Sequence, residues 1–309
     1  MRHLLGCYEI FLYLCGMKRL MAAILLVLVG VCAAHASEKR ALLIGISDYP
    51  QHEAKELRWA PIHGANDISL IEGTLCRQGF TFTALTDSEA TAANVRKAFA
   101  RLLAECRAGD MVYVHFSGHG QAYEDLSGDE DDGWDEALVP YDALRGYRRG
   151  VYEGKNHIVD DELGAVFDAL RTKVGPKGYV YAVLDACHSG GAARGDEMQD
   201  DELFVRGTDQ GFTPNGKRYI PPIDRRGNIA VAPQAGMSGI CILEACRAYQ
   251  TNTEIKEDGR YCGPLTYYVN LVLLDESLSP DTQWVEKVRA LMARDPRLIR
   301  QNMVSEKSN

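Results

Sequence analysis

Short apolar runs alternate with segments of helical period along most of the chain, and this pattern constrains the fold more than any other feature. The run ALLIGIS at 41–47 is typical of a buried strand. In the next periodic segment, 65–78, the apolar residues Ile68, Ile71 and Leu75 fall on one helical face. A strand followed by a helix of this length is the first half of a βαβ unit.

The same alternation continues along the chain. Further strands are predicted at 80–85, at 111–116, from 179 and from 239, and further helices after Thr91, at 160–171, at 265–274 and at 284–292. Repeated βαβ units predict an α/β fold, with an open, mostly parallel sheet and helices on both faces (three layers, α/β/α). An acidic loop at 124–136 and a Gly-, Pro-, Asp- and Arg-rich segment at 191–236 interrupt the pattern. Both follow strands with candidate site residues, which favours a functional role for them.

Composition limits the functional classes. The chain has 309 residues, of which 46% are hydrophobic, and this is enough for a sizeable core. The net charge of −9 disfavours nucleic acid as a partner, because phosphate binding needs a basic surface. We expect a monomer that binds no nucleic acid.

The first residues have the pattern of a secretory signal. A basic pair precedes an apolar run at 20–34 that is too short for a spanning helix and is followed by small residues. We interpret 17–36 as a signal peptide that starts at Met17 and is cleaved after Ala36, and 1–16 as an over-extended start. The prediction is a secreted or periplasmic protein. A membrane-anchored form stays open, because 1–16 is also apolar.

Two predicted strand ends carry a thiol and an imidazole. The strand from 179 ends in LDACHSG, which contains Cys187, and the strand at 111–116 continues into HFSGHG, which contains His119. Ligands bind at the carboxyl ends of strands in an open parallel sheet, so both groups would face one cleft if the strands are neighbours. A thiol beside an imidazole can act as a nucleophile with its acid-base partner. The amides of Gly120 and Cys187 are the natural donors to an oxyanion.

The alternatives are an inert core thiol beside a buried histidine, or a metal site. The matched placement of both groups at strand ends, with glycines beside the histidine, favours chemistry. A zinc site would lack a fourth ligand and a Cys-x-x-Cys pair. His188 is adjacent to Cys187, but successive side chains of an extended strand point to opposite faces, so His119 is the better acid-base partner.

The paired motifs HFSGHG and LDACHSG resemble those of the caspase-like cysteine peptidases (family C14), and within them the metacaspases and their bacterial relatives. The similarity runs through most of 41–303 and includes ALLIGISDY, HGANDISLI, DGWDEALVPYD, VDDEL, ACRAYQTNTE and GPLTYYV. The resemblance implies a caspase-like domain at 37–309. It also implies that Cys187 attacks the scissile carbonyl, that His119 protonates the leaving amine, and that the Gly120 and Cys187 amides form the oxyanion hole.

The resemblance further places Asp67, Ser117 and Asp185 around the pocket for the residue that precedes the cut bond. Two carboxylates in a partly desolvated pocket repel each other unless a cation lies between them, so the pocket should select Arg or Lys. The expected partners are protein or peptide substrates with Arg or Lys at the cleavage site.

Three rival functions remain. The first is a peptidase with the acidic preference of animal caspases, which the two pocket aspartates oppose. The second is a non-catalytic caspase-like binding module, which the retained histidine and cysteine oppose. The third is a thiol hydrolase that acts on non-peptide amides.

Metacaspases often depend on calcium, and the resemblance implies Asp135, Asp160 and Asp161 as its ligands here. The acidic run at 129–132 adds oxygen donors nearby. Arg194 stands where the family has a further aspartate. We therefore expect Ca²⁺ as an activator at most, with no cofactor for the chemistry itself, and the alternative is a solvated acidic loop.

The segment at 191–236 contains basic sites of the kind that such an enzyme would cut. They are Arg194, Arg206, Lys217-Arg218 and Arg225-Arg226. Self-processing is therefore a hypothesis, and the alternative is an ordinary exposed basic loop. Among the cysteines, we favour a disulfide between Cys246 and Cys262, because a secreted location permits one.

Overall fold

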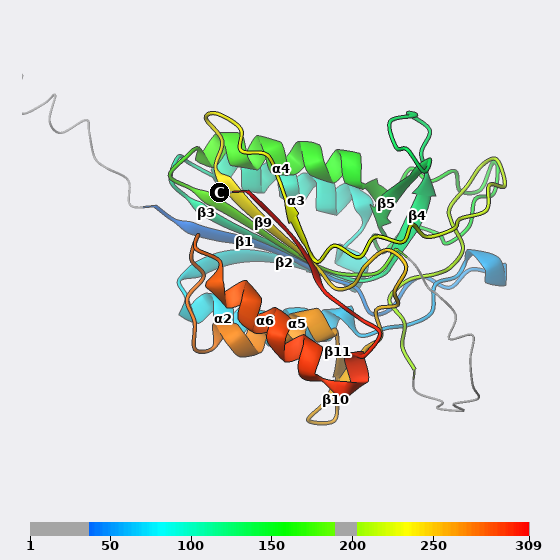
Figure 1. The fold of residues 1–309 in the computed structure, drawn as a ribbon. Helices are drawn as coiled ribbons and strands as arrows, with labels where there is room; N and C mark the ends of the chain where they lie inside the picture. The colour runs from blue at the N-terminus through cyan, green and yellow to red at the C-terminus, as the bar shows by residue number, and fades with distance from the viewer. Residues whose placement is uncertain (1–36, 189–202, 309) are drawn as a thin grey trace, which may run out of the picture. The chain divides into compact units, whose positions relative to one another are not determined.

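A seven-stranded sheet organises the part of the chain that the computed structural model describes, residues 37–188 and 203–308 (Figure 1). The strand order is β2-β1-β3-β7-β9-β12-β8. The bounds are β1 (Lys39–Gly45), β2 (Phe80–Thr86), β3 (Met111–Ser117), β7 (Tyr179–Asp185), β8 (Asn228–Ala230), β9 (Gly239–Glu244) and β12 (Val304–Ser308). The predicted leader at 1–36 and Arg194 lie outside the described residues.

The central strands run parallel. β1 pairs with β2 and β3, β3 pairs with β7, and β7 pairs with β9, all in parallel register. β12 runs against this direction, antiparallel to β9, and β8 is parallel to β12 and so runs against it too. The predicted open, mostly parallel sheet is confirmed.

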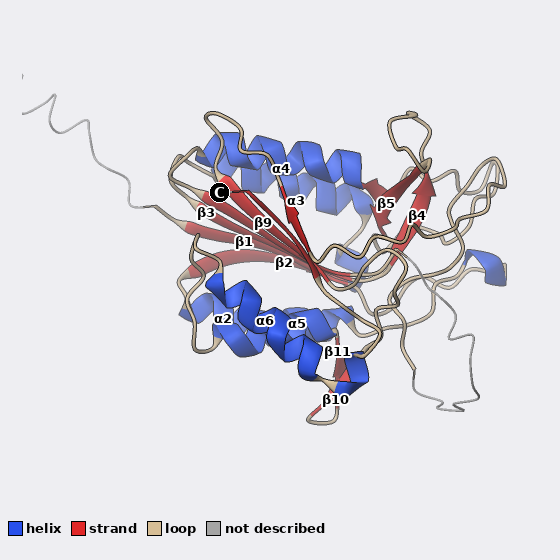
Figure 2. Cartoon of the chain, viewed as in Figure 1, coloured by secondary structure: helices blue, strands red, loops and turns tan. Residues whose placement is uncertain are grey.

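Helices cover both faces of this sheet (Figures 1 and 2). On one face lie α3 (Ala92–Glu105) and α4 (Asp160–Val174), and on the other α2 (Gly64–Arg77), α5 (Pro264–Leu273) and α6 (Gln283–Arg294). Side chains alternate between the faces, so β7 contributes Val180 and Ala182 to one apolar cluster and Tyr181 and Val183 to the other. A strand buried on both faces needs an unbroken apolar sequence, and all of β7 is buried.

Several short elements were not predicted. A second, antiparallel sheet contains β4 (Gly120–Glu124), β5 (Trp134–Leu138) and β6 (Ile158–Val159), and β10 (Ile255–Glu257) forms a hairpin with β11 (Arg260–Cys262). β5 begins inside the predicted acidic loop, and β8 lies inside the irregular segment at 191–236. The 3₁₀ turns are η1 (Lys55–Leu57), η2 (Asp87–Glu89) and η3 (Pro296–Leu298). No helix in residues 37–188 or 203–308 is both long and apolar enough to cross a bilayer.

Candidate active site

The histidine and cysteine motifs lie side by side because β3 and β7 are neighbours. Ser117 pairs with Asp185 at the end of these strands, and His119 and Cys187 follow just beyond that pair. The loops that follow both strands gather at the carboxyl end of the sheet, together with β4 and β5 (Figure 2). Both side chains are buried.

The imidazole of His119 is held on several sides. Its ring stacks on Trp59, with 4.6 Å between ring centroids, and its backbone N–H donates to the hydroxyl of Tyr49 at 3.0 Å. The ring nitrogen Nε2 lies 2.8 Å from the carbonyl oxygen of Ala60, so Nε2 carries a proton. Nδ1 is buried without a hydrogen-bond partner. Burial lowers the pKa of His119 to about 4, so Nδ1 is an acceptor at neutral pH.

The thiol of Cys187 lies close to a second thiol. Its Sγ donates to the carbonyl oxygen of Gln250 at 2.9 Å, and the Sγ of Cys246 donates to it at 3.3 Å. This hydrogen bond, together with burial, raises the pKa of Cys246 well above its usual value.

The favoured disulfide between Cys246 and Cys262 is wrong. Cys246 lies beside Cys187, whereas the Sγ of Cys262 donates to the carbonyl oxygen of Ile255 at 3.8 Å. None of the cysteines among residues 37–188 and 203–308 is in a disulfide. The prediction failed because sequence spacing carries no information on which strand ends meet.

A segment of the chain itself, residues 204–206, lies beside Cys187 and pairs with residues 252–254. The backbone N–H of Arg206 donates to the oxygen of Asn252 at 3.0 Å, and the N–H of Glu254 donates to the oxygen of Phe204 at 2.9 Å. Val205 forms an antiparallel bridge with Thr253 between these two bonds. Antiparallel backbone pairing with an extended peptide is a common mode of peptide recognition.

The carbonyl oxygen of Arg206 lies between the two amides that the sequence predicts as the oxyanion hole. It accepts from the N–H of Cys187 at 3.0 Å and from the N–H of Gly120 at 3.2 Å. The next residue, Gly207, packs so closely that a Cβ there would lie 2.3 Å from the oxygen of Cys187. The peptide bond between Arg206 and Gly207 is therefore presented to Cys187.

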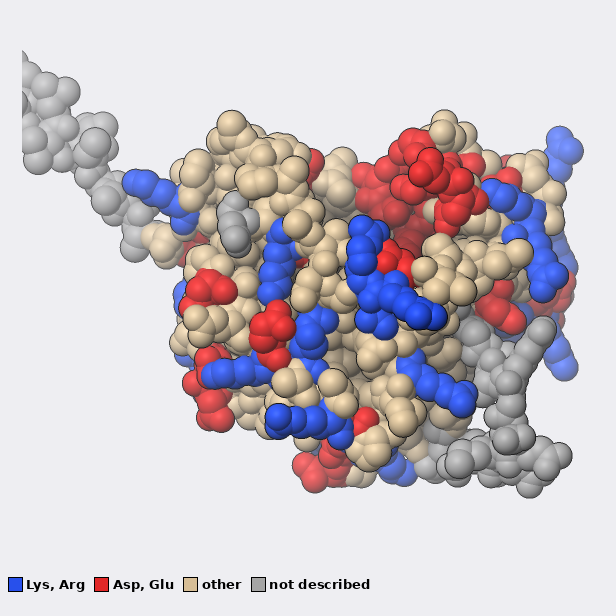
Figure 3. All heavy atoms as spheres, in the orientation of Figure 1, with Lys and Arg blue, Asp and Glu red and all other residues tan. Residues whose placement is uncertain are grey.

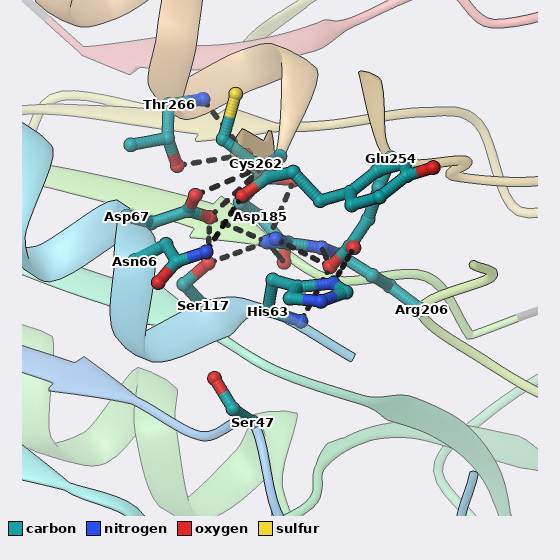
Figure 4. A network of polar contacts seen from close by, with 12 residues as sticks. Ser47, His63, Asn66, Asp67, Ser117, Asp185, Arg206, Glu254, Cys262 and Thr266 are labelled. Carbon is teal, nitrogen blue, oxygen red and sulfur yellow. Dashed lines mark hydrogen bonds and ion pairs between the residues drawn. The ribbon is translucent and has the colours of Figure 1, made fainter. Parts of the chain in front are cut away.

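The side chain of Arg206 fills a fully buried acidic pocket (Figure 4). Its Nη1 donates to the carboxylate of Asp67 at 2.6 Å and to the hydroxyl of Ser117, and it lies 3.6 Å from a carboxylate oxygen of Asp185. Its Nε and Nη2 donate to the carboxylate of Glu254 at 3.0 and 2.9 Å. The structure thus brings together Asp67, Ser117 and Asp185, as the sequence predicts, and adds Glu254.

The pocket carboxylates are fixed by neighbouring groups. Asp185 accepts from the backbone N–H and the hydroxyl of Thr266, both at 2.7 Å, and Asp67 accepts from the N–H of Gly263 at 3.0 Å. Gly263 forms the pocket wall, because a Cβ there would lie 2.2 Å from Asp185. Burial raises the pKa of Asp67 to about 6, although the charge of Arg206 opposes this shift. Such a pocket is electrostatically balanced only when it holds a cation.

Glu254 carried a weak signal in the sequence. It is the last residue of ACRAYQTNTE, a stretch that resembles the family but lies in a loop between β9 and β10 with no apolar period. Its side chain is fully buried with a charge, which only the tertiary structure shows.

The predicted calcium ligands do not form one group. Carboxylate oxygens of Asp125, Asp129 and Asp135 lie within 4.8 Å of one another, and Asp160 and Asp161 lie outside this cluster at the start of α4. Acidic side chains gather over this end of the molecule, near β4 and β5 (Figure 3). Asp135 is buried, and one of its oxygens has no hydrogen-bond partner. Burial, together with the charges of Asp160 and other aspartates, raises its pKa to about 7.

His188 contacts the second sheet. Its Nε2 is 3.5 Å from the carboxylate of Glu136, a residue of β5. Its ring thus faces an acidic side chain of the second sheet.

Comparison with known proteins places the chain among caspase-like peptidases. The metacaspase peptidase C14 domain matches residues 39–194. Metacaspase-1 of Eremothecium gossypii is 36% identical over 164 residues, and metacaspase-1 of Coccidioides immitis is 34% identical over 167 residues. Each match covers 50% of this chain and 32% of the relative, so the chain spans about a third of the length of these relatives.

Solved structures show the same fold. A protein from Geobacter sulfurreducens superposes with a TM-score of 0.56 at 20% identity, covering 88% of this chain and 93% of the other. Caspase-1 from Spodoptera frugiperda superposes with a TM-score of 0.50 at 13% identity, covering 88% of this chain and 86% of the other.

Proposed function

Because the chain belongs to the metacaspase family of C14 peptidases, we propose that it is a cysteine endopeptidase that cuts after arginine or lysine. One observation carries the proposal: a basic residue of the chain lies in the cleft with its side chain in an acidic pocket and its carbonyl oxygen on two backbone amides. This is the arrangement that acyl transfer from a basic residue requires.

The proposed chemistry uses these groups. The thiol proton of Cys187 passes to Nδ1 of His119, and the sulfur attacks the carbonyl carbon. The amides of Gly120 and Cys187 stabilise the negative charge on the carbonyl oxygen. His119 then gives its proton to the leaving amine, and an acyl-enzyme forms on Cys187. A water that gives a proton to His119 hydrolyses this thioester and restores the thiol.

The first test uses peptide reporters. The protein beginning at Ser37 would be assayed on peptides with the chain's own residues 203–205 followed by Arg, Lys or Asp and a fluorogenic amine. We expect wild type to turn over the Arg and Lys reporters, and Cys187→Ala and His119→Ala to turn over neither. No turnover of any reporter would overturn the peptidase proposal, and a preference for Asp would overturn the pocket assignment alone.

The same geometry supports self-processing at the bond between Arg206 and Gly207. Of the basic sites in 191–236, Arg206 is the one in the pocket, and Arg194 lies outside the described residues. Intact-mass analysis of wild type beside Cys187→Ala tests this. Fragments that end at Arg206 and begin at Gly207 are expected only in wild type, and identical intact chains in both would contradict the proposal.

We also propose a Ca²⁺ site on the acidic loop, separate from the chemistry. A buried, unpartnered oxygen of Asp135 beside Asp125 and Asp129 suits a hard cation, which prefers oxygen ligands. Asp160 and Asp161 would add negative charge nearby. Bound Ca²⁺ would neutralise this loop next to the cleft and take no part in bond breaking.

The location outside the cytoplasm is likewise a proposal, supported by the sequence of the leader at 17–36. Expression of the full chain, followed by N-terminal sequencing of the exported protein, tests it. A mature end at Ser37 is expected, and retention of the uncut leader in the cytoplasm would contradict it.

A further inference from the structure

Two separate groups of acceptors contact the arginine side chain in the pocket (Figure 4). The first group contacts Nη1: Asp67 accepts at 2.6 Å, the main-chain oxygen of Asp185 accepts at 3.3 Å, and the hydroxyl of Ser117 also accepts. The second is Glu254 alone, whose Oε1 accepts from Nε at 3.0 Å and from Nη2 at 2.9 Å. One carboxylate oxygen thus accepts from two of the guanidinium nitrogens.

Glu254 is held in place by its other contacts. Its Oε1 accepts from the backbone N–H of His63 at 2.8 Å, and its Oε2 lies 2.6 Å from Nδ1 of the same histidine. The ring of His63 stacks on Tyr261 with 5.0 Å between centroids. The side chain of Glu254 is fully buried. A carboxylate fixed in this way cannot shift to follow a cation of another shape.

A lysine would fit the first group and fail the second. Its ammonium carries all three hydrogens on one nitrogen at the end of the stem, so it has no donor at the position of Nε. A lysine that reaches Asp67 and Asp185 therefore leaves Glu254 without the two donors that arginine supplies. A site with buried hydrogen-bonding groups rejects the analogue that cannot satisfy them.

We propose that Glu254 selects arginine over lysine at the residue before the cut bond, while Asp67 and Asp185 attract either cation. The inference rests on the proposed peptidase function and narrows it to an arginine-selective enzyme. Glu254 is a specificity residue in this assignment, and His63 positions it.

The test compares two reporters that differ in one residue. Both carry the sequence of residues 203–205, followed by Arg or Lys, and kcat/KM is measured for each on wild type, Glu254→Gln and Glu254→Asp. Wild type should prefer Arg by about 10- to 100-fold, and Glu254→Gln should lower the Arg value by about the same factor while the Lys value changes less than about threefold. Glu254→Asp keeps the charge but shortens the side chain, so it should also lose most of the preference.

Glu257→Gln is the matched control. It makes the same chemical change in β10, where Glu257 pairs with Arg297 outside the pocket, and should leave the Arg-to-Lys ratio unchanged. Thermal unfolding verifies that each variant is folded.

Active variants that keep the wild-type ratio would overturn the inference alone. A wild type that cleaves both reporters equally would do the same. A wild type that cleaves neither would overturn the proposed function, and the inference with it.

Discussion

Replacing Gly207 by alanine tests whether the bond after Arg206 is poised for attack. A Cβ at this position would lie 2.3 Å from the carbonyl oxygen of Cys187 and 3.2 Å from its Cβ. Restoring ordinary contact with that oxygen requires a movement of about 1 Å. Such a movement would stretch the bonds of 3.0 and 3.2 Å that hold the Arg206 carbonyl. A misplacement of about 1 Å can cost a factor of about 100 in rate, so we expect self-cleavage to slow about 100-fold.

The assay is a pulse-chase of the protein beginning at Ser37, made by cell-free synthesis, with the fragments separated by gel. Loss of the intact chain gives the rate for wild type, Gly207→Ala and the control Gly164→Ala, which alters a helix position with open space around it. The fluorogenic Arg reporter does not contain Gly207 but needs a pocket that Arg206 has left, so its turnover per cleaved chain should be the same in Gly207→Ala as in wild type. Self-cleavage of Gly207→Ala at the wild-type rate would refute the reasoning, since the bond would then be cut in some other arrangement.

Further predictions concern the pocket, pH and calcium. Asp67→Asn should lower kcat/KM on both the Arg and the Lys reporter by about 30-fold or more, because it removes one partner of a buried, hydrogen-bonded charge pair. A loss confined to the Arg reporter would contradict the roles assigned to Asp67 and Glu254. The unfolding free energy of Cys187→Ala in urea should fall more steeply between about pH 6.5 and pH 4 than that of Cys187→Ala with His157→Gln, because burial lowers the pKa of His157 to about 3. A histidine of this kind is neutral when folded and contributes up to about 1.4 kcal/mol per pH unit, whereas the raised pKa values of buried acids such as Asp67 and Asp135 act in the opposite direction in both proteins. An equal pH dependence in the two proteins would contradict the assignment. Ca²⁺ at about 100 times its Kd should stabilise Cys187→Ala by about 2.7 kcal/mol, which is measured as a higher melting temperature. Mg²⁺ should not produce this increase, and Asp135→Asn should abolish it. Equal melting temperatures with Ca²⁺ and with chelator would contradict the calcium proposal.

The sequence predicted the arrangement of the central sheet because its strands are buried on both faces. β7 is apolar up to its last residue, Asp185, and this signal is local. β3 and β7 are neighbours in the sheet, and this places His119 and Cys187 together. The sequence suggested this proximity only because both residues follow predicted strand ends. By contrast, β8 is three residues long and mostly exposed, and β12 is polar in sequence (VSEKS), so neither carries a periodic signal.

The pocket was predicted only where its residues belong to strands, helices or their ends. Asp67 lies in the first turn of α2, and Ser117 and Asp185 end β3 and β7. Glu254 and Arg206 are in loops, and their meeting depends on backbone pairing between distant segments, Phe204 with Glu254 and Arg206 with Asn252. No local pattern encodes such pairing. The same limit explains why Cys246 was assigned to the wrong partner.

The position of the Arg206–Gly207 bond in the chain also determines what a cut would produce. β7 comes before the bond, whereas β9, β12, α5 and α6 come after it, so the large sheet would be shared between two polypeptides. Cys187 and Asp67 would belong to one product, and Glu254 and Gly263 to the other. Neither product could rebuild the pocket alone. The cut enzyme would be a two-chain complex held by strand pairing, and its stability, unlike that of the uncut chain, would depend on protein concentration through mass action.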